Sequence, residues 1–189
     1  MNQPHLSSGF SELIETLLLS KPLEAATRTV GNNIIMALQA GNCLFSCGNG
    51  GSASDALHFA EEFVGRYRSS RRPLPAVCLN ADVTALTCIG NDFGYENVFS
   101  RQVEALGRFG DILVGFTTSG NSENIIRAFS AAHARKMKTV LVSGNKGGKL
   151  QGICDFELIV PSSNGARIQE IHTLILHTWL EQVELIDWS

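Results

Sequence analysis

The sequence of 189 residues is long enough for one domain with a substantial core, and its 44% hydrophobic and 17% charged residues are ordinary for a globular protein. The formal net charge of -3 argues against a general binder of nucleic acid or of membrane surfaces. No apolar run approaches the ~20 residues of a membrane-spanning helix, no signal peptide is evident, and the five cysteines contain no C-x-x-C pair, so we expect a cytoplasmic protein with reduced cysteines.

Helical and strand-like patterns alternate along the chain. Residues 8–20 and 22–40 predict two helices, with Pro22 well placed to start the second. Short apolar runs then predict buried strands at residues 43–47, 76–79, 112–116, 139–143 and 156–160. Helical patterns occupy residues 54–67, 96–106, 122–136 and 166–186, and a glycine-rich stretch predicts a loop at residues 147–149. This alternation indicates a parallel five-stranded sheet in a three-layer α/β/α domain spanning residues 1–189.

Two glycine- and serine-rich turns each connect a predicted strand to a predicted helix. They read CGNGGS at residues 47–52 and TTSGNS at residues 117–122, and neither has the spacing of a standard nucleotide-binding fingerprint. They could be plain connections, with Ser52 and Asn121 or Ser122 as helix caps. Two such turns, rich in hydroxyls and placed beyond the carboxyl ends of strands, instead favour a phosphorylated, polyhydroxylated small molecule.

Ionisable side chains share one face of the helix after the first turn. Asp55, His58 and Glu62 are spaced three and four residues apart, whereas we expect Glu61 to point elsewhere. A short basic cluster follows, which we expect to be a solvated helix end apart from its first member: Arg66, Arg68, Arg71 and Arg72.

The final predicted helix carries a second polar set. Gln169 and His177 lie two turns apart and broadly on one side, whereas His172 is rotated by roughly 140° from His177 and is expected to pack in the core. Together with His58 and Glu62, these side chains offer nitrogen and oxygen ligands for a zinc-like ion, or a carboxylate base facing an imidazole acid. Packing roles for the two histidines remain open, and either chemical use requires the two helices to converge in the fold or across a subunit interface.

The motifs together resemble one family. The segments CGNGGSASDALHFAEEFVGRY, IGNDFGYENVFSRQVEALGRFGD, TTSGNSENI, GGK and RIQEIHTLILH lie between residues 47 and 177. The chain is similar to the phosphoheptose isomerases, of the sugar-isomerase (SIS) fold. The resemblance implies a flavodoxin-like sheet and an aldose–ketose isomerase that converts D-sedoheptulose 7-phosphate to D-glycero-D-manno-heptose 7-phosphate, the first step of nucleotide-activated heptose biosynthesis. It also implies a homotetramer with active sites at subunit interfaces, in which residues 1–40 pack between subunits and residues 41–189 form the core.

The resemblance also implies roles for individual positions. Glu62 falls at the family's general base and His177 at its general acid. The implied substrate contacts are Asn49, Gly50, Gly51, Glu62, Arg66, Asn91, Asp92, Thr117, Thr118, Ser119, Ser122 and Gln169. Zinc, one ion per subunit, is held in some relatives by the positions that correspond to His58, Glu62, Gln169 and His177. One departure is visible, because Ala166 stands where certain relatives have an aspartate.

One alternative function belongs to a different class. A non-catalytic branch of the same fold binds a replication-initiator protein and lacks the acid/base pair. Because both Glu62 and His177 are present here, the sequence favours the enzyme. We therefore expect a small-molecule sugar phosphate as the ligand, and no nucleic acid or membrane.

Overall fold

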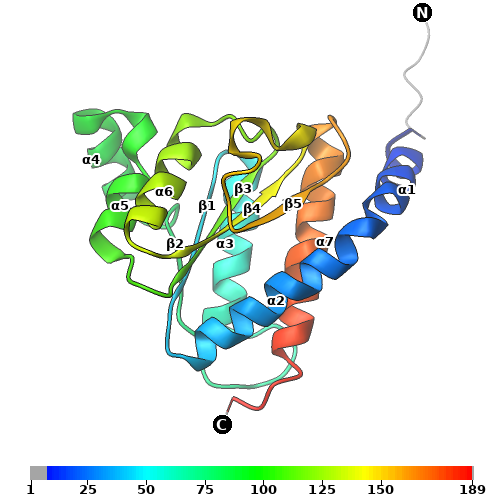
Figure 1. Ribbon diagram of the computed structural model, residues 1–189, viewed down its shortest axis with the longest axis horizontal. Coiled ribbons are helices and arrows are strands. Elements are labelled where there is room, and N and C mark those ends of the chain that lie inside the picture. Colours follow the sequence, from blue (N-terminus) through cyan, green and yellow to red (C-terminus); the bar gives the residue numbers. More distant parts are fainter. Residues whose placement is uncertain (1–7, 189) are drawn as a thin grey trace, which may run out of the picture.

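The strands form one parallel sheet in the order β2-β1-β3-β4-β5 (Figure 1). The computed structural model describes residues 8–188. The strands are β1 (Leu44–Gly48), β2 (Ala76–Cys78), β3 (Ile112–Thr117), β4 (Lys138–Ser143) and β5 (Phe156–Ile159). All five predicted strands are therefore confirmed, with no end displaced by more than one residue.

Helices cover both faces of the sheet, as the three-layer prediction required (Figure 1). Three pack on one face: α2 (Glu24–Gln39), α3 (Gly51–Val64) and α7 (Gly165–Val183). Three pack on the opposite face: α4 (Val83–Phe93), α5 (Ser100–Leu106) and α6 (Glu123–Ala134). The first helix, α1 (Ser8–Ser20), lies at the edge of the molecule against α7.

The central strands separate the core into two halves. Neighbouring side chains along a strand point to opposite faces, so Leu44 packs with α2, α3 and α7 while Phe45 packs with α5 and α6. β1 and β3 are buried over their full lengths, as expected for strands that are covered on both sides. Polar groups at the ends of these strands are therefore the first part of the sheet that a ligand can reach.

The structure differs from the predicted elements at several points. Pro22 lies in a 3-10 turn, η1 (Lys21–Leu23), so α2 begins at Glu24 and not at residue 22, and the ends of α3, α6 and α7 are displaced by up to three residues. α4 was not predicted, because its β-branched residues have low helix propensity. Its N-cap is Asp82, whose carboxylate accepts a hydrogen bond of 2.9 Å from the Ala85 amide. The predicted helix 96–106 is divided into a 3-10 turn, η2 (Tyr95–Asn97), and α5. The predicted loop 147–149 lies within an irregular 3-10 segment, η3 (Asn145–Leu150), that contains non-helical glycines.

The strand order reverses between β1 and β3. From β1 the chain moves outward to β2 and then returns past β1 to β3. Ligands of open α/β sheets bind beyond the carboxyl ends of the strands at such a point. The two turns identified from the sequence follow β1 and β3, which are paired neighbours, so the fold places both turns at the expected binding edge.

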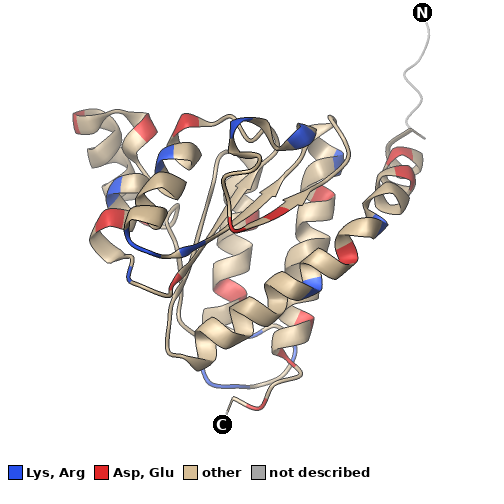
Figure 2. Cartoon of the chain, viewed as in Figure 1, with Lys and Arg blue, Asp and Glu red and all other residues tan. Residues whose placement is uncertain are grey.

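The distribution of charge agrees with the low net charge of the sequence. Figure 2 shows basic and acidic residues interspersed along the helices. Among residues 8–188, no helix is both long and apolar enough to cross a membrane. The five cysteines are free thiols, and Cys88 is the exposed one.

Candidate active site

The turn after β1 brings the start of α3 close against the strand. Gly50 is the N-cap of α3, with a φ of 57° that side-chain-bearing residues rarely adopt. A Cβ at Gly48 would lie 2.2 Å from the Ser52 carbonyl oxygen, so only glycine fits there. Ser52 lies inside α3 and is not its cap, and no side chain caps this helix. The Ser52 and Ala53 amides of its first turn donate instead to the carbonyl oxygens of Asn49 and Gly50, each at 3.0 Å.

The turn after β3 presents hydroxyls at the start of α6. Ser122 is the N-cap of α6, but its side chain makes no capping hydrogen bond. Thr117 Oγ1 and Ser119 Oγ each accept a hydrogen bond of 3.2 Å from a backbone amide of the turn. The positive-φ residue Gly120 packs so closely on η3 that a Cβ would meet its backbone. Capping thus does not account for the serines, and the helix dipole favours an anion at this end.

α7 runs alongside α3 and brings residues from the end of the chain to the first turn. The Gln169 amide lies against Gly51, where a Cβ would be 2.4 Å from Gln169 Nε2. Two turns further along α7, the His177 ring lies edge-on to His58 with the ring centroids 5.0 Å apart. The convergence of the two helices that the chemistry requires is therefore met within one chain.

Glu62, His58 and His177 form the ionisable centre of the site. His58 Nε2 lies 3.3 Å from Glu62 Oε1, and the Glu62 side chain is only 14% exposed. The Tyr67 ring lies 5.6 Å from the His177 ring. Burial and the neighbouring His58 hold the pKa of His177 below its usual value, although Glu62 partly opposes this shift. His177 is therefore neutral at pH 7, and its two ring nitrogens can donate and accept a proton.

A histidine–carboxylate pair, His172 and Asp55, lies deeper between the same helices. His172 is fully buried, with its ring 6.0 Å from that of Phe116 and its Nδ1 3.8 Å from Asp55 Oδ2. Thr173 Oγ1 donates to the other carboxylate oxygen of Asp55 at 3.4 Å. The packing role expected for His172 is confirmed. Through its contacts with His172 and Thr173, Asp55 connects α3 to α7.

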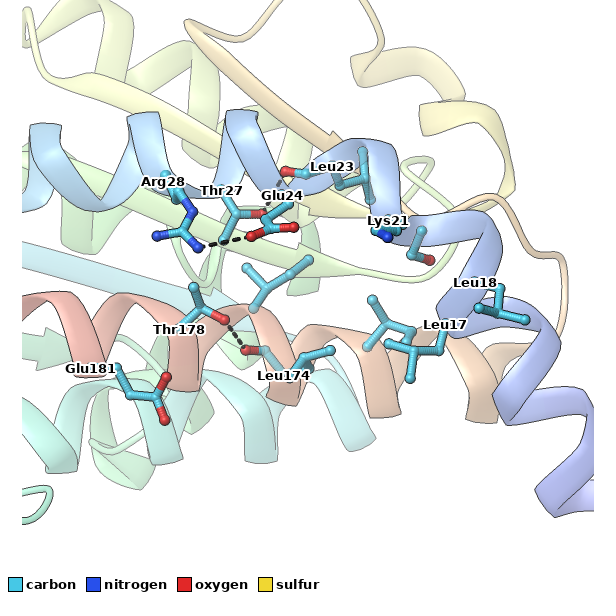
Figure 3. A pocket seen from close by; sticks show the side chains of 13 residues that line it. Leu17, Leu18, Lys21, Leu23, Glu24, Thr27, Arg28, Leu174, Thr178 and Glu181 are labelled. Atoms are coloured by element: carbon cyan, nitrogen blue, oxygen red, sulfur yellow. Dashed lines mark hydrogen bonds and ion pairs between the residues drawn. The ribbon is translucent and has the colours of Figure 1, made fainter.

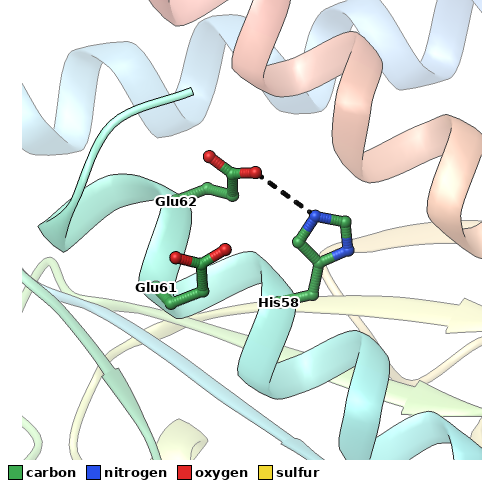
Figure 4. Close-up of side chains that lie close together, drawn as sticks. All are labelled: His58, Glu61 and Glu62. Atoms are coloured by element: carbon green, nitrogen blue, oxygen red, sulfur yellow. Dashed lines mark ion pairs between the residues drawn. The ribbon is translucent and has the colours of Figure 1, made fainter. Parts of the chain in front are cut away.

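The expectation that Glu61 points elsewhere is wrong. One carboxylate oxygen of Glu61, one of Glu62 and a ring nitrogen of His58 all lie within 4.8 Å of one another (Figure 4). Residues three apart share a helix face, and Glu61 follows His58 by three. Glu61 is exposed, however, whereas Glu62 is half-buried.

The basic cluster also departs from the prediction. Arg66 is exposed just beyond the end of α3, whereas the Arg71 side chain is only 6% exposed. Arg71 donates to the carbonyl oxygens of Glu62 and Phe63 at 2.7 and 2.9 Å. The spacing of the four arginines in the sequence does not predict that Arg71 is buried and Arg66 exposed. The burial of Arg71 arises because the chain folds back against the end of α3.

The segment between α4 and α5 lies over the first turn. Asn91 and Asp92 are exposed near the end of α4 and share a hydrogen bond of 2.7 Å. Tyr95, in η2, donates to the Asn49 side chain at 2.9 Å, and Asn124 of α6 contacts the same amide. Tyr95 and Asn124 were not singled out by the sequence, since neither residue type has a distinctive spacing.

Comparison with known proteins identifies the family. A family model of the SIS domain matches residues 10–144. The chain is 46% identical over 188 residues to the phosphoheptose isomerase of Pectobacterium atrosepticum, covering 97% of both proteins. It is also 49% identical over 168 residues to that of Aliarcobacter butzleri, covering 89% of this chain and 86% of the relative. The chain belongs to the phosphoheptose isomerase family.

Solved structures of the phosphoheptose isomerase family share this fold. The phosphoheptose isomerase GmhA from Neisseria gonorrhoeae matches with a TM-score of 0.91 at 41% identity, covering 96% of this chain and 97% of that one. The enzyme from Francisella tularensis matches with a TM-score of 0.93 at 37% identity, with the same coverage. The resemblance and the expectation of an enzyme are thereby confirmed.

Proposed function

We propose that this protein is the aldose–ketose isomerase that converts D-sedoheptulose 7-phosphate to D-glycero-D-manno-heptose 7-phosphate, the first step of nucleotide-activated heptose biosynthesis. The proposal rests mainly on one observation, the convergence of Glu62, His58 and His177 beside the two ligand-binding turns. This arrangement lies in a chain of the phosphoheptose isomerase family. The adaptor alternative has no use for such an acid/base pair.

The reaction needs a base at carbon and a proton carrier at oxygen. Converting a 2-ketose to an aldose moves a proton from C1 to C2 through an enediol. We assign the C1 proton to Glu62, which returns it to C2. Neutral His177 exchanges protons with the substrate oxygens and assists ring opening, because an uncharged imidazole both donates and accepts.

The two turns would hold the remainder of the substrate. Turn hydroxyls and α6 amides bind the phosphate, which places the reacting carbons near α3. The phosphate contacts are Thr117, Thr118, Ser119 and Ser122. The sugar contacts are Asn49, Gly50, Gly51 and Gln169, with Asn91, Asp92 and Arg66 as outer contacts.

Two members of the proposed donor set have the spacing of zinc ligands. Two ligands of a tetrahedral zinc, each about 2.0–2.1 Å from it, lie about 3.3 Å apart, and His58 Nε2 and Glu62 Oε1 are 3.3 Å apart. His177 and Gln169 complete the proposed set from α7. When bound, zinc would polarise the substrate carbonyl as a Lewis acid. Glu62 would then be a weaker base, since a metal-bound carboxylate holds a proton less readily, and His177 would keep only one ring nitrogen for proton exchange.

Metal content tests this set without reference to activity. We expect one zinc per subunit in the purified protein by elemental analysis, and loss of zinc in His58→Ala. Glu61→Gln is the matched control on the same helix, and it should retain the metal. Loss of zinc from Glu61→Gln, or its retention in His58→Ala, would contradict the proposed ligands.

Self-association is supported by an uncovered apolar surface. On α1, Phe10, Ile14 and Leu18 are 82%, 61% and 67% exposed. Next to them, a groove of about 360 Å³ lies between α1, α2 and α7 and contains Leu17 and Leu174 (Figure 3). Exposed apolar patches of this kind mark interaction sites. We propose that neighbouring copies cover this face in a homotetramer whose active sites lie at subunit interfaces.

Light scattering of the purified protein tests the assembly. We expect a tetramer, and Leu18→Glu should dissociate it and lower activity because the interfacial sites are lost. Leu185→Glu places the same charge on an 84% exposed leucine near the C-terminus, and it should stay tetrameric and active. A monomeric wild-type protein with full activity would refute both the assembly and the interfacial site.

A cytoplasmic location is also proposed. Burial, together with the nearby Asp111, raises the pKa of Cys43 to about 11, and burial raises that of Cys154 to about 12. These thiols stay protonated and unreactive at neutral pH. Free cysteines fit a reducing compartment.

The decisive experiment is incubation with sedoheptulose 7-phosphate, with and without a chelator, followed by NMR for a new aldose phosphate. Glu62→Gln and His177→Asn should each lower turnover by about 10²–10⁴ while calorimetry still detects substrate binding. His133→Asn, which changes a histidine at the end of α6, should be fully active. Near-normal turnover by Glu62→Gln would remove its assignment as the base, and no product from the wild-type protein would refute the proposed reaction.

A further inference from the structure

Three side chains from distant parts of the chain meet at the first turn. Asn49 Oδ1 accepts two hydrogen bonds of 2.9 Å, one from Asn124 Nδ2 and one from the Tyr95 hydroxyl. Asn49 Nδ2 donates in return to Asn124 Oδ1 at 2.9 Å. Asn124 lies 75 residues and Tyr95 46 residues from Asn49 in the sequence. The network therefore connects the turn after β1 with η2 and with the first turn of α6.

The hydrogen-bonding capacity of Asn49 is almost filled by this network. An amide oxygen has two lone pairs and an amide nitrogen carries two protons. Both lone pairs of Asn49 Oδ1 are used, whereas one of the two Nδ2 protons is not. Asn49 can therefore offer a ligand one donor and no acceptor.

The partners differ in burial, which fixes the orientation of the amide from two sides. Asn124 is 3% exposed, so its side chain is packed against Asn49 and cannot swing away from it. The Tyr95 residue is 62% exposed, and its hydroxyl reaches Asn49 from the outer side of the turn. Rotating the Asn49 amide alone by 180° would place its NH₂ group against the Asn124 NH₂ group, which is unfavourable without an acceptor.

We infer that Asn124 and Tyr95 are positioning residues that make Asn49 a dedicated hydrogen-bond donor to an oxygen of the bound sugar. This inference rests on the proposed function, since it assumes that the sugar phosphate occupies the edge between the two turns. A single oriented donor favours a carbonyl or enediolate oxygen, which can only accept, over a hydroxyl group. Tyr95 and Asn124 act through Asn49 and touch no substrate atom themselves.

A double-mutant cycle separates positioning from general support of the turn. Tyr95→Phe removes only the hydroxyl, whereas Asn124→Asp replaces the amide donor by a carboxylate oxygen and so also adds a charge. Each should lower kcat/KM for sedoheptulose 7-phosphate by roughly three- to tenfold, the effect of losing one hydrogen bond. In an Asn49→Ala background, the same changes should lower kcat/KM by less than about twofold, because the residue that they orient is gone.

The controls make each outcome decisive. Asn97→Asp makes the same chemical change in η2 at a residue whose side chain bonds to Phe93 and Arg127, and it should leave kcat/KM unchanged. Tyr95→Phe keeps the ring, so the test stands even if the buried Asn124→Asp variant does not fold. Equal losses in both backgrounds, or no loss in the wild-type background, would overturn this inference alone. No turnover by the wild-type protein would instead refute the proposed function, and this inference with it.

Discussion

Replacing the buried Arg71 by methionine should destabilise the protein far more than replacing an exposed arginine of the same cluster. The Arg71 guanidinium donates to the carbonyls of Glu62 and Phe63 at the end of α3, at 2.7 and 2.9 Å. It also lies 3.8 Å from Glu184, whose side chain is 11% exposed. Methionine keeps the length of the side chain but leaves three carbonyls, that of Arg72 included, and one carboxylate without this partner.

The size of the effect follows from burial. A hydrogen bond to a charged group contributes about 1.5–3 kcal/mol, and removing one partner of a buried ion pair costs about 3–5 kcal/mol. These contributions overlap, so the free energy of unfolding of Arg71→Met should fall by about 3–5 kcal/mol. For a domain of this length, each kcal/mol lowers Tm by about 2–4 °C, which gives a total of about 6–20 °C.

Thermal unfolding of matched variants tests this reasoning. Arg68 forms an ion pair of 2.8 Å with Glu181, but the two side chains are 65% and 51% exposed, so Arg68→Met should cost at most about 1 kcal/mol. Adding Glu184→Gln to Arg71→Met should recover part of the loss, because it removes the unpaired carboxylate. The reasoning is refuted if Arg71→Met lowers Tm no more than Arg68→Met does.

The remaining predictions concern the site itself. The pKa of His177 is lowered from 6.5 in the folded protein, so the unfolded chain binds a proton at this residue first as the pH falls. The stability that the neutral imidazole contributes is therefore complete above pH 6.5 and is lost as the pH falls toward the folded pKa. His177→Asn should accordingly reduce the drop in Tm between pH 7.5 and pH 5.5. Ser119→Ala combined with Ser122→Ala should raise KM about tenfold or more with little change in kcat, and an unchanged KM would place the phosphate elsewhere. Gly51→Ala should fold but displace the Gln169 amide, since a Cβ would lie 2.4 Å from its Nε2, and steady-state kinetics should record a higher KM.

The Gly51 prediction has a matched control on another helix. A Cβ at Gly31 of α2 would lie 2.1 Å from Gln182 Oε1, so Gly31→Ala displaces a second glutamine of α7 by the same mechanism. Gln182 bonds to α2 and lies outside the proposed site. The control should therefore change Tm but not KM, and equal effects of both variants on KM would mean that Gln169 has no specific role.

Much of the fold could be predicted from local patterns, for physical reasons that particular elements make clear. β1 and β3 are buried on both faces and consist mostly of apolar residues, so the sequence predicts their positions. α4 was missed because its stability comes from the Asp82 cap and from packing, not from intrinsic propensity. The two turns were identified because glycine at a position such as Gly50 is needed for its backbone conformation.

The site was predictable only where it is local. His58 and Glu62 lie on one helix, and their i, i+4 spacing already implied contact. The approach of His177 to His58 depends on the packing of α3 against α7, which no spacing within either helix encodes. Arg71, Asn124 and Tyr95 were missed for the same reason, since each acts through a contact that only the folded chain creates.

The fold places the proposed phosphate contacts and the proposed proton-transfer groups on different elements, so their contributions to KM and kcat can be measured separately. The turn after β3 belongs to the sheet edge and carries hydroxyls and amides, whereas the ionisable groups lie on α3 and α7. A phosphate bound at the turn is chemically unchanged during isomerisation, so its contacts stabilise ground state and transition state alike and affect KM. In the proposed mechanism, Glu62 and His177 contact atoms whose protonation changes, so their loss should affect kcat. Asn49 lies between the two sets and is hydrogen-bonded to α6 and η2. Under the proposal above, its orientation therefore couples phosphate binding to the placement of the reacting oxygens.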